Sequence, residues 1–147
     1  RKLGSRMASE LKSLDIKLSP GNVTEGMKKH LPTDYSGAIV GQVEMIIGHA
    51  RYKRLKDKMF DREGNFQDSY KARQSEPESY RRGRRQHIIN ETLEKANTEA
   101  QRAIKDFLKG QVEAGETADL SKMEGLELID LTAEQLSDYA NHVYQND

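Results

Sequence analysis

The chain has 147 residues, a length that fits a single domain. Its composition is 35% hydrophobic and 33% charged, so we expect it to bury less apolar surface per residue than an ordinary globular domain, in which about 25% of residues are charged. The absence of Cys excludes disulfides, thiolate metal sites and thiol nucleophiles. No apolar run approaches the roughly 18 residues of a membrane span, so we expect no membrane insertion.

The first predicted element is a helix over residues 5–18, which ends at the turn signal Ser19–Asn22. Its apolar residues recur at spacings of four, three and four, which places them on one face of a helix: Met7, Leu11, Leu14 and Leu18. A short second helix is predicted to begin near Thr24 and to end at Pro32, with its apolar residues on one side: Val23, Met27 and Leu31.

A long helix is predicted from Tyr35 to Phe60. Its apolar residues follow helical spacing: Ile39, Val43, Ile46, Ala50, Leu55 and Met59. The stretch Ala38–Ile47 is rich in β-branched residues, so a buried strand is the alternative, but the pattern continues through Met59 and favours a helix. Residues 61–77 are predicted to be a loop with a turn at Arg62–Asn65.

A third long helix is predicted from a cap at Ser75, with Pro77 in its first turn, to Val112. It carries the longest apolar stripe of the chain: Tyr80, Ile88, Ile89, Leu93, Ala96, Ala100, Ile104, Phe107 and Leu108. Residues 113–125 read as a spacer and Leu126–Leu131 as an extended segment, with a short strand as the alternative.

The last predicted helix begins at Thr132, where Thr132–Gln135 forms a capping box. Its apolar face consists of Leu136, Tyr139, Ala140 and Val143. The sequence therefore predicts an all-α fold of four to five helices, extended or bundle-like. Because the apolar content is low, we expect neighbouring subunits to cover stripes that one subunit leaves open.

Charge is sorted along the chain although the total is neutral. Residues 1–110 contain 23 Lys or Arg and 15 Asp or Glu (net +8), whereas residues 111–147 contain one Lys and nine Asp or Glu (net −8). We therefore divide the chain into a basic helical region, residues 1–112, and an acidic tail with a C-terminal helix, residues 113–147, that together form one structural unit. Such sorting creates local potentials that the net charge hides.

Two blocks concentrate the basic residues, and we predict that both contact nucleic acid. The candidate binding residues are Arg51, Lys53, Arg54, Lys56, Lys58, Arg62, Arg81, Arg82, Arg84 and Arg85. The second block falls in the first turns of a helix, where the helix dipole disfavours cations, so an external anion is the favoured explanation. Arg binds phosphate with a planar fork of fixed charge. Pairing with acidic residues of the same or a neighbouring chain, or a simple solubility role, remain as alternatives.

No catalytic motif competes with this charge signal. The four His residues are far apart in sequence without metal-ligand spacing, no carboxylate pair lies in an apolar neighbourhood, and no Gly-rich phosphate loop is present. We therefore expect no enzymatic activity, no catalytic residues, no metal, no cofactor and no small-molecule substrate. Tyr52, Tyr70 and Tyr80 lie among the basic blocks and could stack on bases, although residues at the edge of a core are the commoner case.

The leading hypothesis is a structural protein that self-assembles, or assembles with a related subunit, and coats nucleic acid through phosphate contacts. The absence of a finger, RNP or helix-turn-helix pattern favours backbone contacts over base recognition. The alternative is a helical scaffold, adaptor or ejection-type assembly protein that binds only protein. The chain begins at Arg1, so we expect a processed protein or a piece of a longer chain.

The chain resembles the small helical capsid proteins of filamentous archaeal viruses. The resemblance rests on length, on the predicted helices Met7–Leu18, Ile39–Met59 and Ile88–Val112, and on the Arg blocks embedded in them. It implies helices packed around duplex DNA and a location in the virion, with the cytoplasm as the alternative. Plentiful Asn and Gln, as in Glu63–Gln67, depart from the composition expected in a very hot habitat.

Overall fold

The computed structural model describes residues 2–29, 31, 37–71 and 75–123, and this part of the chain is all-α, as predicted. It contains four α-helices and one short 3-10 turn: α1 (Lys2–Ser13), α2 (Gly21–Lys28), α3 (Gly37–Met59), α4 (Glu78–Glu113) and η1 (Leu120–Lys122). The predicted extended segment at Leu126–Leu131 and the predicted helix from Thr132 lie outside the described residues.

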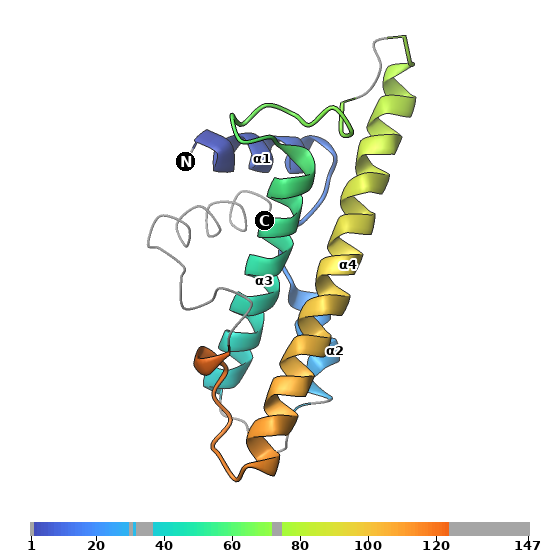
Figure 1. Cartoon of the computed structure of the whole chain (residues 1–147). Coiled ribbons are helices and arrows are strands. Elements are labelled where there is room, and N and C mark those ends of the chain that lie inside the picture. Colours follow the sequence, from blue (N-terminus) through green and yellow to red (C-terminus); the bar gives the residue numbers. More distant parts are fainter. Residues whose placement is uncertain (1, 30, 32–36, 72–74, 124–147) are drawn as a thin grey trace.

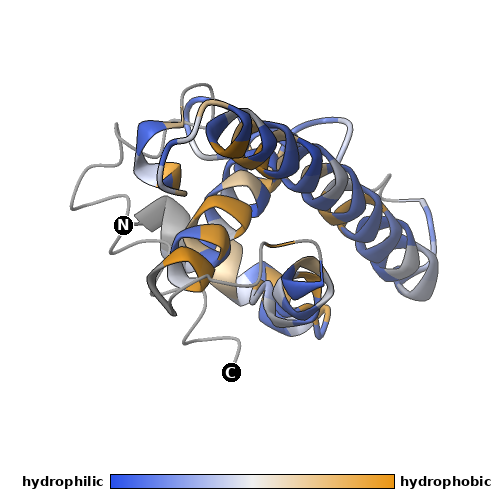
Figure 2. Cartoon of the chain, turned by 90° about the horizontal axis from the view of Figure 1, so that it is seen from below, coloured by the Kyte–Doolittle hydropathy of each residue, from blue (hydrophilic) through white to orange (hydrophobic). Residues whose placement is uncertain are grey.

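The two long helices, α3 and α4, run antiparallel and side by side (Figure 1). α1 lies across one end of this pair, beside the C-terminal end of α3, and α2 and η1 lie toward the other end (Figure 1). Hydrophilic and hydrophobic residues alternate along the helical ribbons, as expected for amphipathic helices that bury one face (Figure 2). The helix predicted over residues 35–60 is therefore confirmed as α3 over its described part, and the strand alternative is wrong.

The interior divides into two hydrophobic clusters, one toward each end of the α3–α4 pair. The first joins α1 and the segment after it to the C-terminal half of α3 and to α4, and includes Met7, Leu11, Leu18, Leu55, Met59, Tyr70, Ile89 and Leu93. The second joins α2, the N-terminal half of α3, α4 and η1, and includes Met27, Val43, Ile46, Ile47, Ile104, Leu108 and Leu120. The helix faces that the sequence marked as apolar pack, except at the start of α4, where the prediction of Tyr80 as a member of the buried stripe is wrong because its side chain is 58% exposed.

α1 ends at Ser13, five residues before the predicted end at Leu18. The Ile16 amide donates to the Leu11 carbonyl at 2.7 Å and the Asp15 amide donates to Lys12 at 3.0 Å, the two hydrogen bonds of a Schellman motif. Asp15 takes the left-handed conformation that this motif requires, with φ of 58°. Leu14 and Leu18 are still buried, Leu14 from the turn that ends the helix and Leu18 from the non-helical segment after it, where burial alternates from residue to residue.

The loop that follows α3 is tied back to that helix. Phe60 and Phe66 form an isolated antiparallel bridge, and their rings stack with centroids 5.2 Å apart. Asp61 closes the turn between them, because its carboxylate accepts hydrogen bonds from the amides of Glu63 and Asn65 at 3.0 and 2.9 Å. α4 then begins at Glu78 with Pro77 as its N-cap, so the prediction of Ser75 as cap is wrong.

Two glutamines hold the segment after α4 against the long helices. The amide of Gln111, buried on α4, exchanges two 2.9 Å hydrogen bonds with the backbone of Asp119. Gln42 on α3 accepts from the Leu120 amide at 3.0 Å and donates to the Asp119 carboxylate at 3.1 Å. Hydrogen bonds from Ser121, followed by the one from Gln42, lower the pKa of Asp119. Residues 118–123 of the predicted spacer are thus packed, with Leu120 and Met123 buried, whereas residues 113–117 are exposed.

Candidate nucleic-acid interface

The two predicted basic blocks lie toward the same end of the helix pair, where the α3 block is beside residues 88–100 of α4 and the α4 block packs farther out, against α1 and the loop. Arg51–Lys58 lies in the C-terminal half of α3, and Arg81–Arg85 lies in the first turns of α4, which runs in the opposite direction beside it (Figure 1). We call this end, together with α1 and residues 60–71, the basic end. α1 and the loop add three exposed cations that the sequence interpretation missed because they stand outside the two blocks: Arg6, Lys12 and Lys71.

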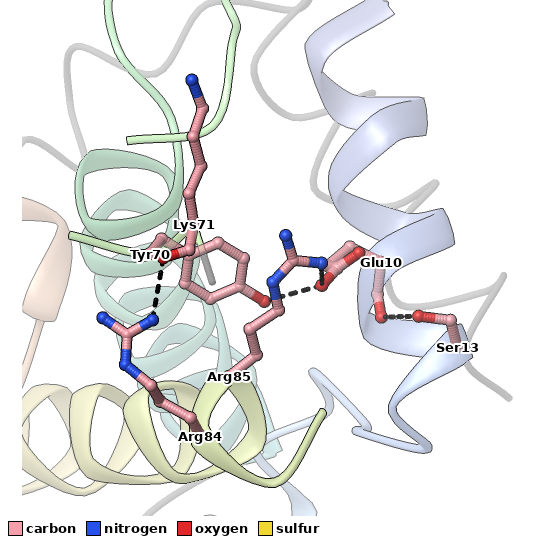
Figure 3. A network of polar contacts seen from close by, with 6 residues as sticks. All are labelled: Glu10, Ser13, Tyr70, Lys71, Arg84 and Arg85. Atoms are coloured by element: carbon pink, nitrogen blue, oxygen red, sulfur yellow. Dashed lines mark hydrogen bonds and ion pairs between the residues drawn. The ribbon is translucent and has the colours of Figure 1, made fainter. Parts of the chain in front are cut away.

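Arg85 is the most enclosed of the predicted binding residues on α4. Its guanidinium group lies 3.3 Å from the Glu10 carboxylate, and their side chains are 25% and 13% exposed. The same group stacks on Phe66 and Tyr70, 4.8 and 5.2 Å from the ring centroids. Arg85 therefore joins α4 to α1 and to the loop, which is a structural contact that the sequence interpretation did not foresee (Figure 3).

Tyr70 completes this network. It is fully buried, and its hydroxyl donates to the Glu10 carboxylate at 2.9 Å (Figure 3). Burial, followed by the charge and the hydrogen bond of Glu10, raises the pKa of Tyr70 far above its ordinary value of 10.0. Tyr70 is therefore a neutral hydrogen-bond donor over the whole physiological range and is not available to stack on a base.

Arg84 is also engaged within the chain. It donates hydrogen bonds of 2.8 Å to the backbone carbonyls of Ser69 and Lys71, so it fixes the end of the loop on α4 (Figure 3). Carbonyl oxygens leave the positive charge of a guanidinium group uncompensated. Arg84 therefore contributes to the potential of the basic end even though its donors are occupied.

The first half of the α3 block is engaged as well. Arg51 is buried and donates to the Lys17 carbonyl at 3.3 Å, and Lys53 is half-buried. Arg54 forms an ion pair with Glu99 of α4, and both side chains remain about half exposed. These three residues lie nearer the middle of the helix pair and are less suited to an external anion than the rest of the block.

Five predicted residues remain open toward solvent, and we call them the open cations: Lys56, Lys58, Arg62, Arg81 and Arg82. Lys58, Arg62 and Arg82 are exposed and form no ion pair within the described residues. Lys56 is half-buried, with its ammonium group 5.9 Å from the centre of the Tyr52 ring, and Arg81 is half-buried. The open cations come from α3, the loop and α4, so the fold brings together residues up to 26 positions apart.

Hollows at the basic end are lined by mixed charges. A cavity of about 250 Å³ between α1 and α4 is lined by Arg81, Arg82 and Arg85 together with Glu10 and Glu78. A second hollow of about 450 Å³ between α3 and α4 is lined by Arg54, Lys58 and Lys95 with Asp57 and Glu91. Carboxylates inside both hollows disfavour a tightly enclosed anion, so the exposed surface of the open cations is the better candidate for phosphate contacts.

Of the three tyrosines proposed to stack on bases, only Tyr80 is exposed, at 58%. Within the described residues no group of three or more His, Cys, Asp or Glu side chains could hold a metal ion. No helix in the described part of the chain combines the length and the apolar character needed to cross a membrane. No protein-family model matches this chain, and no curated protein and no solved structure matches it either.

Proposed function

We propose that this chain is a structural protein, without catalytic activity, that binds the phosphate backbone of duplex DNA through the open cations of its basic end. Copies of the chain, or of a related subunit, assemble along the DNA, as capsid proteins do in a virion. The observation that carries the proposal is the position of these five cations, three exposed and two half-buried, on three separate segments toward one end of the helix pair.

Electrostatics supports this proposal. Cations placed in the first turns of a helix are unfavourable without an anion nearby, and Arg81 and Arg82 lie in the first two turns of α4. Glu78 is the one acidic residue in the first turn. A phosphate that bridges Arg82 and a neighbouring cation would relieve this repulsion and release condensed counterions from DNA. Such contacts position a protein on DNA without recognising sequence.

Direct DNA binding tests the proposal. We expect the wild-type chain to bind a labelled duplex at low salt, with log affinity falling linearly against log salt concentration. Because five open cations neutralise at most five phosphates per chain, the slope should not exceed about 4.5 in magnitude. The double variant Arg81→Gln with Arg82→Gln should lower the slope by about 2.

A matched control removes two exposed cations from the same helix away from the basic end: Arg102→Gln with Lys109→Gln. This variant has the same net charge as the first and should keep the wild-type slope. If the wild-type chain does not bind duplex DNA at low salt, or if both double variants lose affinity equally, the proposal is wrong.

Assembly is tested separately by electron microscopy of the chain mixed with linear duplex DNA. Many weak contacts per subunit become strong binding when subunits repeat along one DNA molecule. We expect protein-coated filaments whose length follows that of the DNA. Binding of isolated chains without repeating subunits would support DNA binding and contradict the capsid part of the proposal.

A scaffold or adaptor that binds only protein is the second candidate, and a specific observation favours it. Arg51, Arg84 and Arg85 use their donors within the chain, and Arg54 is paired with Glu99, so four of the ten predicted binding residues already serve the fold. An absence of DNA binding together with stable self-association in sedimentation would select this candidate.

A further inference from the structure

An open hollow lies between α1 and the loop after α3, and the proposed DNA contacts do not use it. Its volume of about 900 Å³ is within the range of about 300–1,000 Å³ that is typical of ligand cavities. Its α1 wall carries the short side chains Ser5 and Ser9, and Phe60 and Phe66 contribute apolar surface. We call it the α1 groove.

The rim of the α1 groove is partly basic. Arg6 and Lys71 line it and are both exposed, and Arg6 donates a hydrogen bond to the Gly64 carbonyl across the groove. Two carboxylates also line the groove, and both already accept hydrogen bonds within the chain: Glu10 from Arg85 and Tyr70, and Asp61 from the amides of Glu63 and Asn65. Lys71 lies 3.6 Å from the fully exposed Asp68 carboxylate, an ion pair in open solvent that a docked acidic segment would have to replace. Short side chains on one wall, aromatic rings and exposed cations together suit an amphipathic helix whose polar positions are acidic.

The chain itself contains one segment of this chemistry. Residues 124–147 carry six Asp or Glu and no Lys or Arg. Within them, the helix predicted from Thr132 has an apolar face that includes Leu136 and Ala140, and it carries Glu134 and Asp138. No other segment outside the described residues combines acidic charge with an apolar helical face.

The connecting residues are long enough for this segment to reach the groove. η1 is anchored on Gln42, and Phe60 follows 18 positions later along α3, a distance of about 27 Å at 1.5 Å per residue. The eight residues 124–131 span up to about 29 Å when extended. A helix that starts at Thr132 could therefore begin at the level of the groove.

We propose that the C-terminal segment, residues 132–143, docks as a helix in the α1 groove of the same chain, with its apolar face on Phe60 and Phe66 and its acidic side toward Arg6 and Lys71. A short connection gives the segment a millimolar effective concentration, which favours the same chain over a second copy. This proposal does not depend on DNA binding, since none of the open cations lines the groove.

Cysteine cross-linking tests the proposal cleanly because the chain has no Cys of its own. Ser9 is exposed and lines the groove, and Ala140 lies on the predicted apolar face. We expect the pair Ser9→Cys with Ala140→Cys to form a disulfide within one chain under mild oxidation, detected as a faster-migrating monomer on a non-reducing gel and by peptide mass.

Two control pairs define the background. Asn141→Cys replaces the tail position with one on the opposite side of the predicted helix, and Ser19→Cys replaces the groove position with an exposed serine outside the groove. We expect both pairs to cross-link at least fivefold more slowly. A disulfide-linked dimer as the main product would assign the segment to a second copy, and equal rates in all pairs would exclude docking; either result overturns the proposal.

Proteolysis gives a second measurement that requires no cross-link. A glutamate-specific protease cuts after Glu134, and docking should protect this site. Ser9→Asp places a negative charge in the groove and should speed the cleavage severalfold, whereas Ser19→Asp should leave the rate unchanged. An unchanged rate in the Ser9 variant would contradict docking in the groove, and circular dichroism of each variant verifies that the helices are intact.

Discussion

The two ends of the α3–α4 pair are held together by different chemistry. At the basic end, an Arg–Glu–Tyr network and stacked aromatic rings join α1, the loop and α4. At the other end, aliphatic residues such as Ile47 and Ile104 are fully buried, and the amides of Gln42 and Gln111 hold the following segment. One end is built with charge in its interior and the other without it.

This difference shows that a basic residue such as Arg85 can have a structural role, in which it joins helices instead of facing solvent. A buried ion pair contributes little net stability, because the cost of desolvating both charges offsets their attraction, but removing one partner is costly. The network at the basic end therefore fixes the geometry of α1 and the loop more than it raises the free energy of unfolding. At the other end, which we call the aliphatic end, stability comes from burial of apolar side chains, whereas the basic end combines its own hydrophobic cluster with the charged network.

The largest loss of unfolding free energy should come from a substitution at the aliphatic end. Ile104→Ala removes a fully buried side chain from the contact of α4 with α3, and should lower the free energy of unfolding by about 3 kcal/mol, measured by urea denaturation. Val112→Ala deletes an exposed aliphatic group from the same helix and should cost less than about 0.5 kcal/mol. Equal losses would show that α4 does not pack as described.

Removing Glu10 from its network with Arg85 and Tyr70 should cause the next largest loss of unfolding free energy. Glu10→Ala leaves Arg85 and the Tyr70 hydroxyl without their acceptor, and should cost about 2 kcal/mol of unfolding free energy. The double variant Glu10→Leu with Arg85→Met replaces both charges by apolar groups and should recover the part of this loss that comes from the unpaired Arg85, while the Tyr70 hydroxyl stays without an acceptor. A double variant less stable than Glu10→Ala would contradict the view that the pair specifies geometry more than stability.

Alkaline pH should separate the two ends further, because the tyrosines that are buried among the described residues, Tyr52 and Tyr70, both belong to the cluster at the basic end. Tyr70 keeps its proton in the folded chain, while in the unfolded chain it ionises near its ordinary pKa of 10.0. Its contribution is complete below pH 10 and is lost above it, at about 1.4 kcal/mol per pH unit. We expect the unfolding free energy of the wild type to fall more steeply above pH 10 than that of Tyr70→Phe, and parallel curves would refute this.

The amide clamps at the other end should give a local effect. Gln111→Ala removes two hydrogen bonds to Asp119 and should cost about 1 kcal/mol. Because the loss is local, amide hydrogen exchange should rise in residues 118–123 and stay unchanged in α1. Faster exchange at both ends would show that the clamp supports the whole fold.

The exposed ion pair between the two ends should contribute least to the free energy of unfolding. Arg54 and Glu99 join α3 to α4 at a site that is about half open to solvent. Glu99→Gln should change the unfolding free energy by less than about 1 kcal/mol, and the difference from wild type should vanish at 1 M salt. A loss that persists at high salt would mean that the pair is less accessible than described.

The helices were predictable from the sequence because their apolar stripes are periodic, and α3 and α4 follow the predicted stripes closely. The end of α1 was not predictable, because the apolar stripe continues through Leu18 while the helix ends before Asp15. Asp15 takes a left-handed conformation, which Asp tolerates better than most residues. All four residues of the stripe are buried, but Leu14 is in the turn that ends α1 and Leu18 is in the non-helical segment after it.

The candidate site was predictable only in part. Sequence reasoning located both basic blocks, but it could not separate Arg85, which packs on two aromatic rings, from Arg82, which is exposed. That distinction depends on Glu10 and Tyr70, which are 75 and 15 positions away in the chain. The buried Gln111 clamp was missed for the same reason, since a glutamine in a polar-rich helix gives no local signal.

The start of α4 has a kinetic consequence. Its first buried residue is Ile89, so eleven residues, Glu78–Ile88, are held by the side chains of Arg84 and Arg85 in place of a hydrophobic face. We expect a segment anchored in this way to unwind and rewind more often than the rest of α4, whose apolar face is buried. A partner that binds Arg81 or Arg82 would therefore keep these three turns folded for longer. Its binding could be followed as slower hydrogen exchange of their backbone amides.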